Sequence, residues 1–253
     1  IVLDGFGLAG ARGGTFEVAA ARLELTNAGN WAPAQNFSPG PGDSSFFAIG
    51  SGLFSDYGFS NFNLAAVGRR ADDNGESLRI DGDTSVHVET RSRALDADYV
   101  SQATGTEVGE FTTSVLLPEM DRPAASVTLQ VAPNSAALSG SAVVGRLNME
   151  EGASLTADAG TKFNLSGIGG IFMDGLIRAP SGSVRLFVDN PRSSFDAGFQ
   201  PELRIELGEH AVIDVSGTTL LKPNDAGLRI GEVLSGGSVE LIANRGSVVT
   251  AAG

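Results

Sequence analysis

Seven acidic residues fall into three short clusters, and paired carboxylates can carry glycoside cleavage or bind a cation. Each cluster lies in or beside a segment whose Gly, Asn and Asp residues predict a turn. The acids are Asp72, Asp73, Glu76, Asp81, Asp83, Asp96 and Asp98. Asp81 and Asp83 would share one turn and could meet Asp72 or Asp73 from a nearby turn. A β-rich polysaccharide lyase or glycoside hydrolase and a weak calcium site are therefore both hypotheses, although solvated acidic turns are the favoured interpretation.

The only histidines are His87 and His210, and both lie in segments where apolar residues alternate with polar ones. Val86 and Val88 beside His87, and Ala211 and Ile213 after His210, are expected to point inward, so both imidazoles are predicted to face solvent. The chain has no Cys and no G-x-S-x-G motif. We therefore assign no catalytic, cofactor-binding or metal-ligating residue, and we expect no cofactor.

The segment GFGLAG, from Gly5 to Gly10, matches the G-x-G-x-x-G pattern of dinucleotide-binding proteins. That chemistry requires a helix directly after the glycines, because the helix N-terminus holds the pyrophosphate. Here ARGGTFEV follows, which has a further glycine pair and the alternation of a strand. The nearest acids, Glu17 and Glu24, also come too early to bind a ribose. These glycines are instead predicted to form corners between short strands.

A group of aromatic residues could stack against a sugar, or could form a core or docking patch, which is the favoured interpretation. The group comprises Trp31, Phe37, Phe46, Phe47, Phe54, Tyr57, Phe59 and Phe62.

Composition excludes several classes of protein. The chain has 253 residues and a formal net charge of −13, from 30 acids and 17 bases. This charge repels nucleic acid and anionic membranes. No apolar run approaches the ~20 residues that span a bilayer. The absence of Cys suits a chain that is exported unfolded. The sequence begins at Ile and stops in mid-pattern, so we expect a segment of a longer chain.

Short runs of period-2 alternation dominate the chain and predict an all-β fold. The runs are TFEVAA, NFNLAA, SVHVET, SVTLQVAP, SLTADAG, KFNLSG, SVRLFVDN, LRIELG, AVIDVSG and SVELIANRG. The best helical candidate, LAAVGRRADDNGE, is broken by Gly68 and Gly75. Similar units recur: a strand, a Gly turn and a second strand appear in Leu78–Glu89, Leu147–Gly160 and Leu203–Gly217. Such recurrence indicates a solenoid in which each turn packs against its neighbours.

We therefore predict one right-handed parallel β-helix over residues 1–253, with loop or hairpin inserts that break the pattern. The inserts are expected at about 27–45, 91–123 and 221–235. Loops carried on a rigid scaffold are common binding sites.

The segments LRIELGEHAVIDVSGTT and SGGSVELIANRGSVVTAAG resemble the repeats of filamentous haemagglutinin-type exoproteins, the passengers of two-partner secretion systems. GGTFEVAAARLELTNAG and YGFSNFNLAAVG have the same character. The resemblance extends over most of the chain and implies a secreted right-handed β-helix. The Asn-Pro-rich motifs of that family's N-terminal secretion domain are absent.

The expected role is that of an adhesin or an extracellular filament or stalk, secreted or held at a bacterial cell surface, without enzymatic activity. Its partners would be a receptor or glycan on a host or neighbouring cell, or further copies in a fibre. An outer-membrane transporter would act during export, and nucleic acid is not an expected partner. The alternative is a β-helical polysaccharide lyase or glycoside hydrolase that uses the turn carboxylates.

Overall fold

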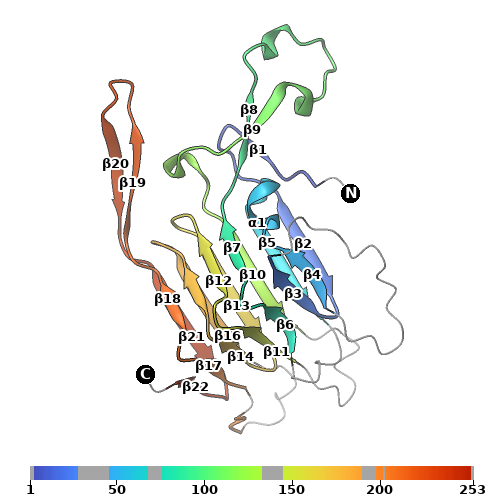
Figure 1. Cartoon of the computed structure of the whole chain (residues 1–253), viewed down its shortest axis with the longest axis vertical. Coiled ribbons are helices and arrows are strands. Elements are labelled where there is room, and N and C mark those ends of the chain that lie inside the picture. Colours follow the sequence, from blue (N-terminus) through green and yellow to red (C-terminus); the bar gives the residue numbers. More distant parts are fainter. Residues whose placement is uncertain are drawn as a thin grey trace.

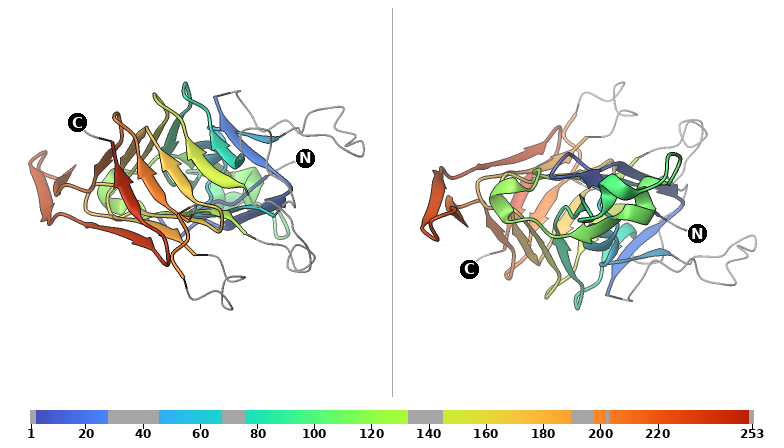
Figure 2. Two further views of the ribbon diagram at one scale, coloured as in Figure 1. Left: turned by 90° about the horizontal axis from the view of Figure 1, so that it is seen from below. Right: turned by 90° about the horizontal axis from the view of Figure 1, so that it is seen from above.

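The computed structural model describes residues 3–27, 46–67, 76–132, 145–189, 198–201 and 203–251. The fold is mostly β, with 49% of residues in strands and 7% in helices, which confirms the all-β prediction. Three parallel sheets make up the body of the molecule (Figures 1 and 2). Their strands lie side by side in the order of the sequence, except for the first two strands of the seven-stranded sheet.

The six- and seven-stranded sheets gather strands from most of the length of the chain, and the four-stranded sheet gathers strands from Ser85 onward. The six-stranded sheet contains, in spatial order, β2 (Thr15–Ala20), β5 (Asn61–Ala66), β10 (Ser126–Val131), β13 (Lys162–Gly167), β16 (Ser183–Val188) and β21 (Ser238–Ala243). The seven-stranded sheet contains β4 (Phe47–Gly50), β3 (Leu23–Thr26), β6 (Glu76–Ile80), β11 (Arg146–Met149), β14 (Ile171–Met173), β17 (Ile205–Leu207) and β22 (Val248–Thr250). The four-stranded sheet contains β7 (Ser85–Val88), β12 (Ser154–Ala157), β15 (Leu176–Arg178) and β18 (Val212–Asp214).

From β5 onward the chain visits these sheets in a constant order: six-stranded, seven-stranded, four-stranded. We call one such pass a round. The shortest round is 21 residues long, because Lys162 pairs with Ser183 on the next strand of the same sheet. The sequence units Leu78–Glu89, Leu147–Gly160 and Leu203–Gly217 cover the corner between the seven- and four-stranded sheets in three rounds. The β14–β15 corner belongs to the same column, although the sequence did not identify it as a unit.

The core lies between the sheets and is built from ladders of equivalent residues. One ladder in the six-stranded sheet joins aromatic and β-branched side chains through successive in-register pairs. Its members are Phe16, Phe62, Val127, Phe163, Val184 and Val239. A ladder in the seven-stranded sheet joins Leu23, Leu78, Leu147, Ile171, Ile205 and Val248. Period-2 alternation places these side chains inward because successive residues of a strand point to opposite faces.

Two antiparallel hairpins interrupt the rounds and project from the stacked strands (Figure 1). The first joins β8 (Ser92–Leu95) to β9 (Thr112–Val115), and β8 also pairs with β1 (Gly7–Leu8). Three 3₁₀ turns accompany it: η1 (Tyr99–Ser101), η2 (Val108–Phe111) and η3 (Glu119–Asp121). The second hairpin joins β19 (Thr218–Pro223) to β20 (Arg229–Leu234). The insert expected at 27–45 lies outside the described residues except for Asn27.

The glycines of GFGLAG serve close packing and do not open a helix. Strand β2 follows them, so the helix N-terminus that a dinucleotide requires is not formed. A Cβ atom on Gly5 would lie 2.3 Å from the Phe59 ring, and one on Gly13 would lie 1.7 Å from the Gly58 carbonyl oxygen. Gly10 has a φ of 82°, which favours glycine. Gly5, Gly10 and Gly13 lie outside the strands, as predicted for corner residues, whereas Gly7 belongs to β1.

A helical turn and a cluster of aromatic rings cover part of the N-terminal end of the stack. The single turn α1 (Leu53–Asp56) lies against β7, and the Phe54 carbonyl accepts a hydrogen bond from the Glu89 amide at 3.3 Å. Phe54 and Phe59 contact Phe62, with ring centroids 4.8 and 6.4 Å away, and all three rings are buried. Much of the predicted aromatic group is therefore core, while Trp31 and Phe37 lie outside the described residues.

Candidate functional site

The C-terminal end of the stack differs from the rest in the exposure of its inward-facing residues. Val184 is fully buried, whereas Val239, its partner on the next strand, is 43% exposed. Ile205 is fully buried, whereas its partner Val248 is also 43% exposed. The side chains are similar and the registers are continuous, so the difference arises because no described strand lies beyond β21 and β22.

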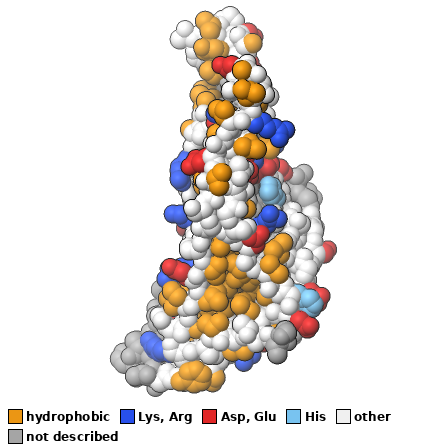
Figure 3. All heavy atoms as spheres, turned by 90° about the vertical axis from the view of Figure 1, so that its left-hand side faces the viewer, with side chains coloured by type: hydrophobic (Ala, Val, Ile, Leu, Met, Phe, Trp, Pro, Cys, Tyr) orange, Lys and Arg blue, Asp and Glu red, His pale blue; other side chains and the backbone are white. Residues whose placement is uncertain are grey.

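Figure 3 shows this end face, with hydrophobic side chains gathered over its lower part. The partly buried residues that pack on the core from the last strands are Leu207, Ile213, Val215, Leu241 and Ala243. We call these residues, with Val239 and Val248, the open edge.

The backbone of β21 also has one free side. The amides of Ser238 and Asn244 donate to carbonyl oxygens of the preceding round at 3.1 and 3.0 Å. In a parallel ladder alternate residues bond to the same neighbour, so the amides of Val239, Leu241 and Ala243 face away from β16. An apolar face beside a strand with unpaired backbone amides is suited to the addition of another strand.

The acids expected to form turns do not come together as a group. Asp72 and Asp73 lie outside the described residues. Glu76 is the first residue of β6 and is buried, which corrects the expectation of a solvated turn; Asn148 on the adjacent strand donates to its Oε1 atom at 2.6 Å. Asp96 and Asp98 lie in the β8–β9 hairpin, where the Asp96 carboxylate accepts a hydrogen bond from the Thr113 hydroxyl at 2.6 Å.

Asp81 does lie at a corner, beside Arg79 and Glu24. Burial raises the pKa of the Asp81 carboxyl and Glu24 raises it further, while Arg79, 2.8 Å away, opposes the shift. Asp83 contributes its carbonyl oxygen, which accepts a hydrogen bond from the Asn27 side chain. The paired arrangement required for glycoside cleavage is therefore not formed by the described members of these clusters.

Acidic side chains instead bridge successive corners of one column, the connection from the seven- to the four-stranded sheet. The Gly82 amide donates to Glu150 Oε2 at 3.0 Å, and the His210 amide donates to Asp174 Oδ1 at 2.7 Å. Glycine permits the close stacking: Gly152 has a φ of 85°, and a Cβ there would lie 2.5 Å from the Gly82 carbonyl oxygen. These acids thus satisfy backbone groups of the neighbouring round.

In the same column, His210 lies between two carboxylates. Its Nδ1 is 3.5 Å from Asp174 Oδ2, and its Nε2 is 3.6 Å from Glu151 Oε1. Contact with Asp174, and then the charge of Glu151, raises the pKa of the His210 imidazole. The three residues line a surface pocket of about 360 Å³. Both histidine side chains are about half exposed, as alternation predicted, but the sequence did not indicate that His210 meets two acids.

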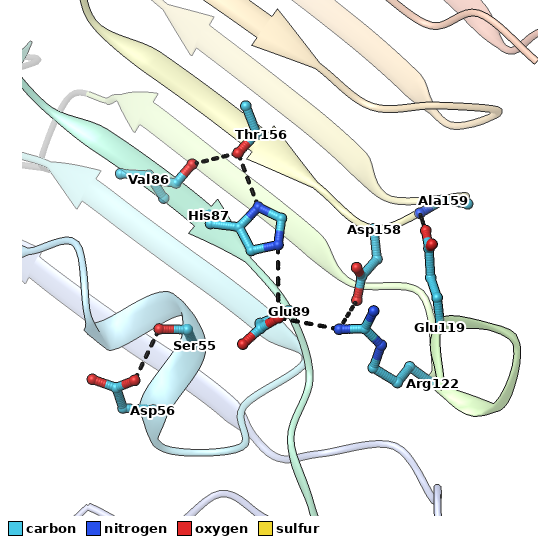
Figure 4. Close-up of polar contacts among 10 residues, drawn as sticks. All are labelled: Ser55, Asp56, Val86, His87, Glu89, Glu119, Arg122, Thr156, Asp158 and Ala159. Atoms are coloured by element: carbon cyan, nitrogen blue, oxygen red, sulfur yellow. Dashed lines mark hydrogen bonds and ion pairs between the residues drawn. The ribbon is translucent and has the colours of Figure 1, made fainter. Parts of the chain in front are cut away.

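A second group of charges lies where the chain returns to the stacked sheets after the β8–β9 hairpin, a segment we call the first excursion (Figure 4). Arg122 Nη1 is 3.1 Å from both Glu89 Oε2 and Asp158 Oδ2, and all three side chains are largely buried. Burial raises the pKa of Asp158 to about 7 despite the opposing charge of Arg122. Glu119 accepts a hydrogen bond from the Ala159 amide at 2.9 Å. These contacts fasten the excursion to the β12–β13 turn.

Comparisons with protein-family models, curated proteins and solved structures found no match to this chain. Within the described residues, no helix is both long and apolar enough to cross a membrane.

Proposed function

We propose that the chain is a right-handed parallel β-helix that acts as a rod segment of a secreted or bacterial cell-surface exoprotein of the filamentous haemagglutinin type. Its role would be that of an adhesin or of a filament or stalk, without chemistry of its own. Partners would be a cell-surface receptor or glycan or further copies of the chain, with an outer-membrane transporter acting during export.

The order of the strands supports the β-helix. Successive rounds pass through three sheets in the same order, and every strand pair within those sheets is parallel. About 98% of crossover connections between parallel strands of one sheet are right-handed, which supports the proposed hand. A stack of such rounds resists bending and can carry projecting hairpins, as a stalk or adhesin requires.

The constant order of the strands carries the proposal, and the open edge is where this rod segment can accept a further strand. Terminal repeats usually cover the core of a solenoid. Here Phe16 and Leu23 in the first strands are buried, whereas Val239 and Val248 in the last strands are exposed. The C-terminal end combines exposed valines with a free strand side, so it is suited to another strand with matching alternation. For the chain alone, that strand would come from a second copy. Two C-terminal edges can pair about a twofold axis, because the same surface on both copies then forms the interface.

This association tests the proposal. Wild-type protein should sediment as a monomer when dilute and as a larger species when concentrated. Val239→Pro should remain monomeric, because proline removes an outward amide without removing a hydrogen bond to β16. Val239→Ala, which loses most of the side chain but keeps the amide, should still associate.

A wild-type chain that stays monomeric at every concentration, or a Val239→Pro variant that associates like wild type, would contradict the role of this edge. The enzyme alternative is tested separately with a panel of polysaccharides. We expect no release of sugar, because Glu89 and Asp158, the carboxylates joined by Arg122, are largely buried and ion-paired. Measurable release would favour a lyase or hydrolase.

A further inference from the structure

We propose that Glu151, Asp174 and His210 form a binding site for one divalent transition-metal ion, with Zn²⁺ the ion that best fits these ligands. The site would use one imidazole nitrogen and one oxygen from each carboxylate, with water completing the coordination. This proposal does not depend on the function proposed above.

The positions of the three residues follow from the stacking of the rounds. Glu151 lies between β11 and β12, Asp174 between β14 and β15, and His210 between β17 and β18. The three corners are consecutive members of one column, so residues far apart in the sequence come together. One potential ligand atom from each residue lies within 4.8 Å of the other two.

One ion can bind only one nitrogen of the His210 ring, so the relevant spacing is that of one ligand atom from each residue. Ligands about 2.1 Å from Zn²⁺ in tetrahedral geometry are roughly 3.4 Å apart, and one potential ligand atom from each of the three residues lies within 4.8 Å of the other two. The side chains therefore need to approach one another by at most about 1.4 Å to bind an ion. Asp174 is held in place because its Oδ1 accepts the His210 amide. The Glu151 side chain is 67% exposed, so it can move toward an ion without disturbing the core.

The donor set distinguishes the class of metal. Ca²⁺ and Mg²⁺ take oxygen ligands almost exclusively, whereas imidazole with carboxylates suits Zn²⁺ and its first-row neighbours. Besides these three residues, the pocket is lined by Gly152, Ala153, Ser154, Gly175 and Leu176. It leaves room for water ligands beside the ion. An ion here would join three successive rounds, including the β17–β18 corner next to the open edge.

The two histidines provide a matched experiment. Titration calorimetry with ZnCl₂ should show one Zn²⁺ per wild-type chain, and His210→Gln should weaken binding at least tenfold. His87→Gln should bind like wild type, because His87 has one nearby carboxylate, Glu89 at 3.7 Å. Glu151→Gln should weaken binding without affecting the fold, since that side chain is exposed. CaCl₂ should bind more weakly than ZnCl₂.

Three results would overturn the proposal. They are the absence of Zn²⁺ binding to the wild type, equal binding by wild type and His210→Gln, or a loss of binding in His87→Gln comparable to that in His210→Gln. Circular dichroism of each variant distinguishes a lost ligand from a lost fold.

Discussion

Replacing Arg122 by Met should lower the free energy of unfolding by about 3 kcal/mol at pH 8, because two largely buried carboxylates would lose their shared cation. Arg122 lies 3.1 Å from both Glu89 and Asp158, and the three side chains are between 10 and 16% exposed. Methionine keeps much of the apolar part of the arginine side chain, so the lost free energy of unfolding measures mainly the loss of the positive charge. Denaturant unfolding measures it, and a loss below about 0.5 kcal/mol would contradict the account.

The same group predicts a dependence on pH. The pKa of Asp158 is about 7 in the folded chain and 3.8 ordinarily, so folding favours the protonated carboxyl. Protonation of Asp158 therefore stabilises the folded chain fully below pH 3.8, and this stabilisation is lost as the pH rises through 7. Asp158→Asn should therefore match wild type at about pH 4 and exceed it by about 2 kcal/mol at pH 8, after allowance for solvent screening. If the free energies of unfolding of the two proteins differ by the same amount at every pH, the raised pKa of Asp158 is excluded. The cost of Arg122→Met should likewise be smaller at pH 5, where Asp158 is largely protonated.

The second large effect is expected in the core. Leu186→Ala should cost about 3 kcal/mol, because Leu186 is fully buried between the rounds and its loss leaves a cavity. Leu241 is its partner on the next strand, with the same residue type and register, but is only partly buried. Leu241→Ala should therefore cost only about 1 kcal/mol in dilute protein.

Because both variants replace a leucine by alanine, a difference between their costs arises from the position of the residue in the stack and not from its type. Chemical denaturation at low protein concentration measures both costs, and equal costs would mean that the edge is covered in the monomer. At high concentration the cost of Leu241→Ala should rise if a second copy covers the open edge.

Much of the fold could be predicted because burial in a parallel stack follows period-2 alternation. In β10, β13 and β16 every residue predicted to point inward is buried. The strands β14 and β15 were missed because their residues, Ile-Phe-Met and Leu-Ile-Arg, place apolar side chains next to each other and do not alternate. The partial cover of the N-terminal end was not predicted either, since α1 is a single turn without a helical repeat.

The candidate sites were harder to predict, because each joins residues from different rounds. Alternation correctly exposes His210, but only the stacking of three corners brings it to Glu151 and Asp174. Glu76 was expected in a turn because of the glycine and asparagine before it, yet its partner Asn148 lies 72 residues away on a neighbouring strand. Burial of Arg122 with two acids likewise depends on where the first excursion returns to the stack.

Amide hydrogen exchange in β21, followed residue by residue at several protein concentrations, tests the central claim most directly. The claim is that β21 is a parallel edge strand whose free side accepts another strand. The amides of Ser238, Glu240 and Ile242 should be protected at every concentration, because they face β16. Those of Val239, Leu241 and Ala243 should exchange rapidly in dilute protein and become protected as the concentration rises. Equal protection of both sets in dilute protein, or no effect of concentration on the second set, would contradict the account.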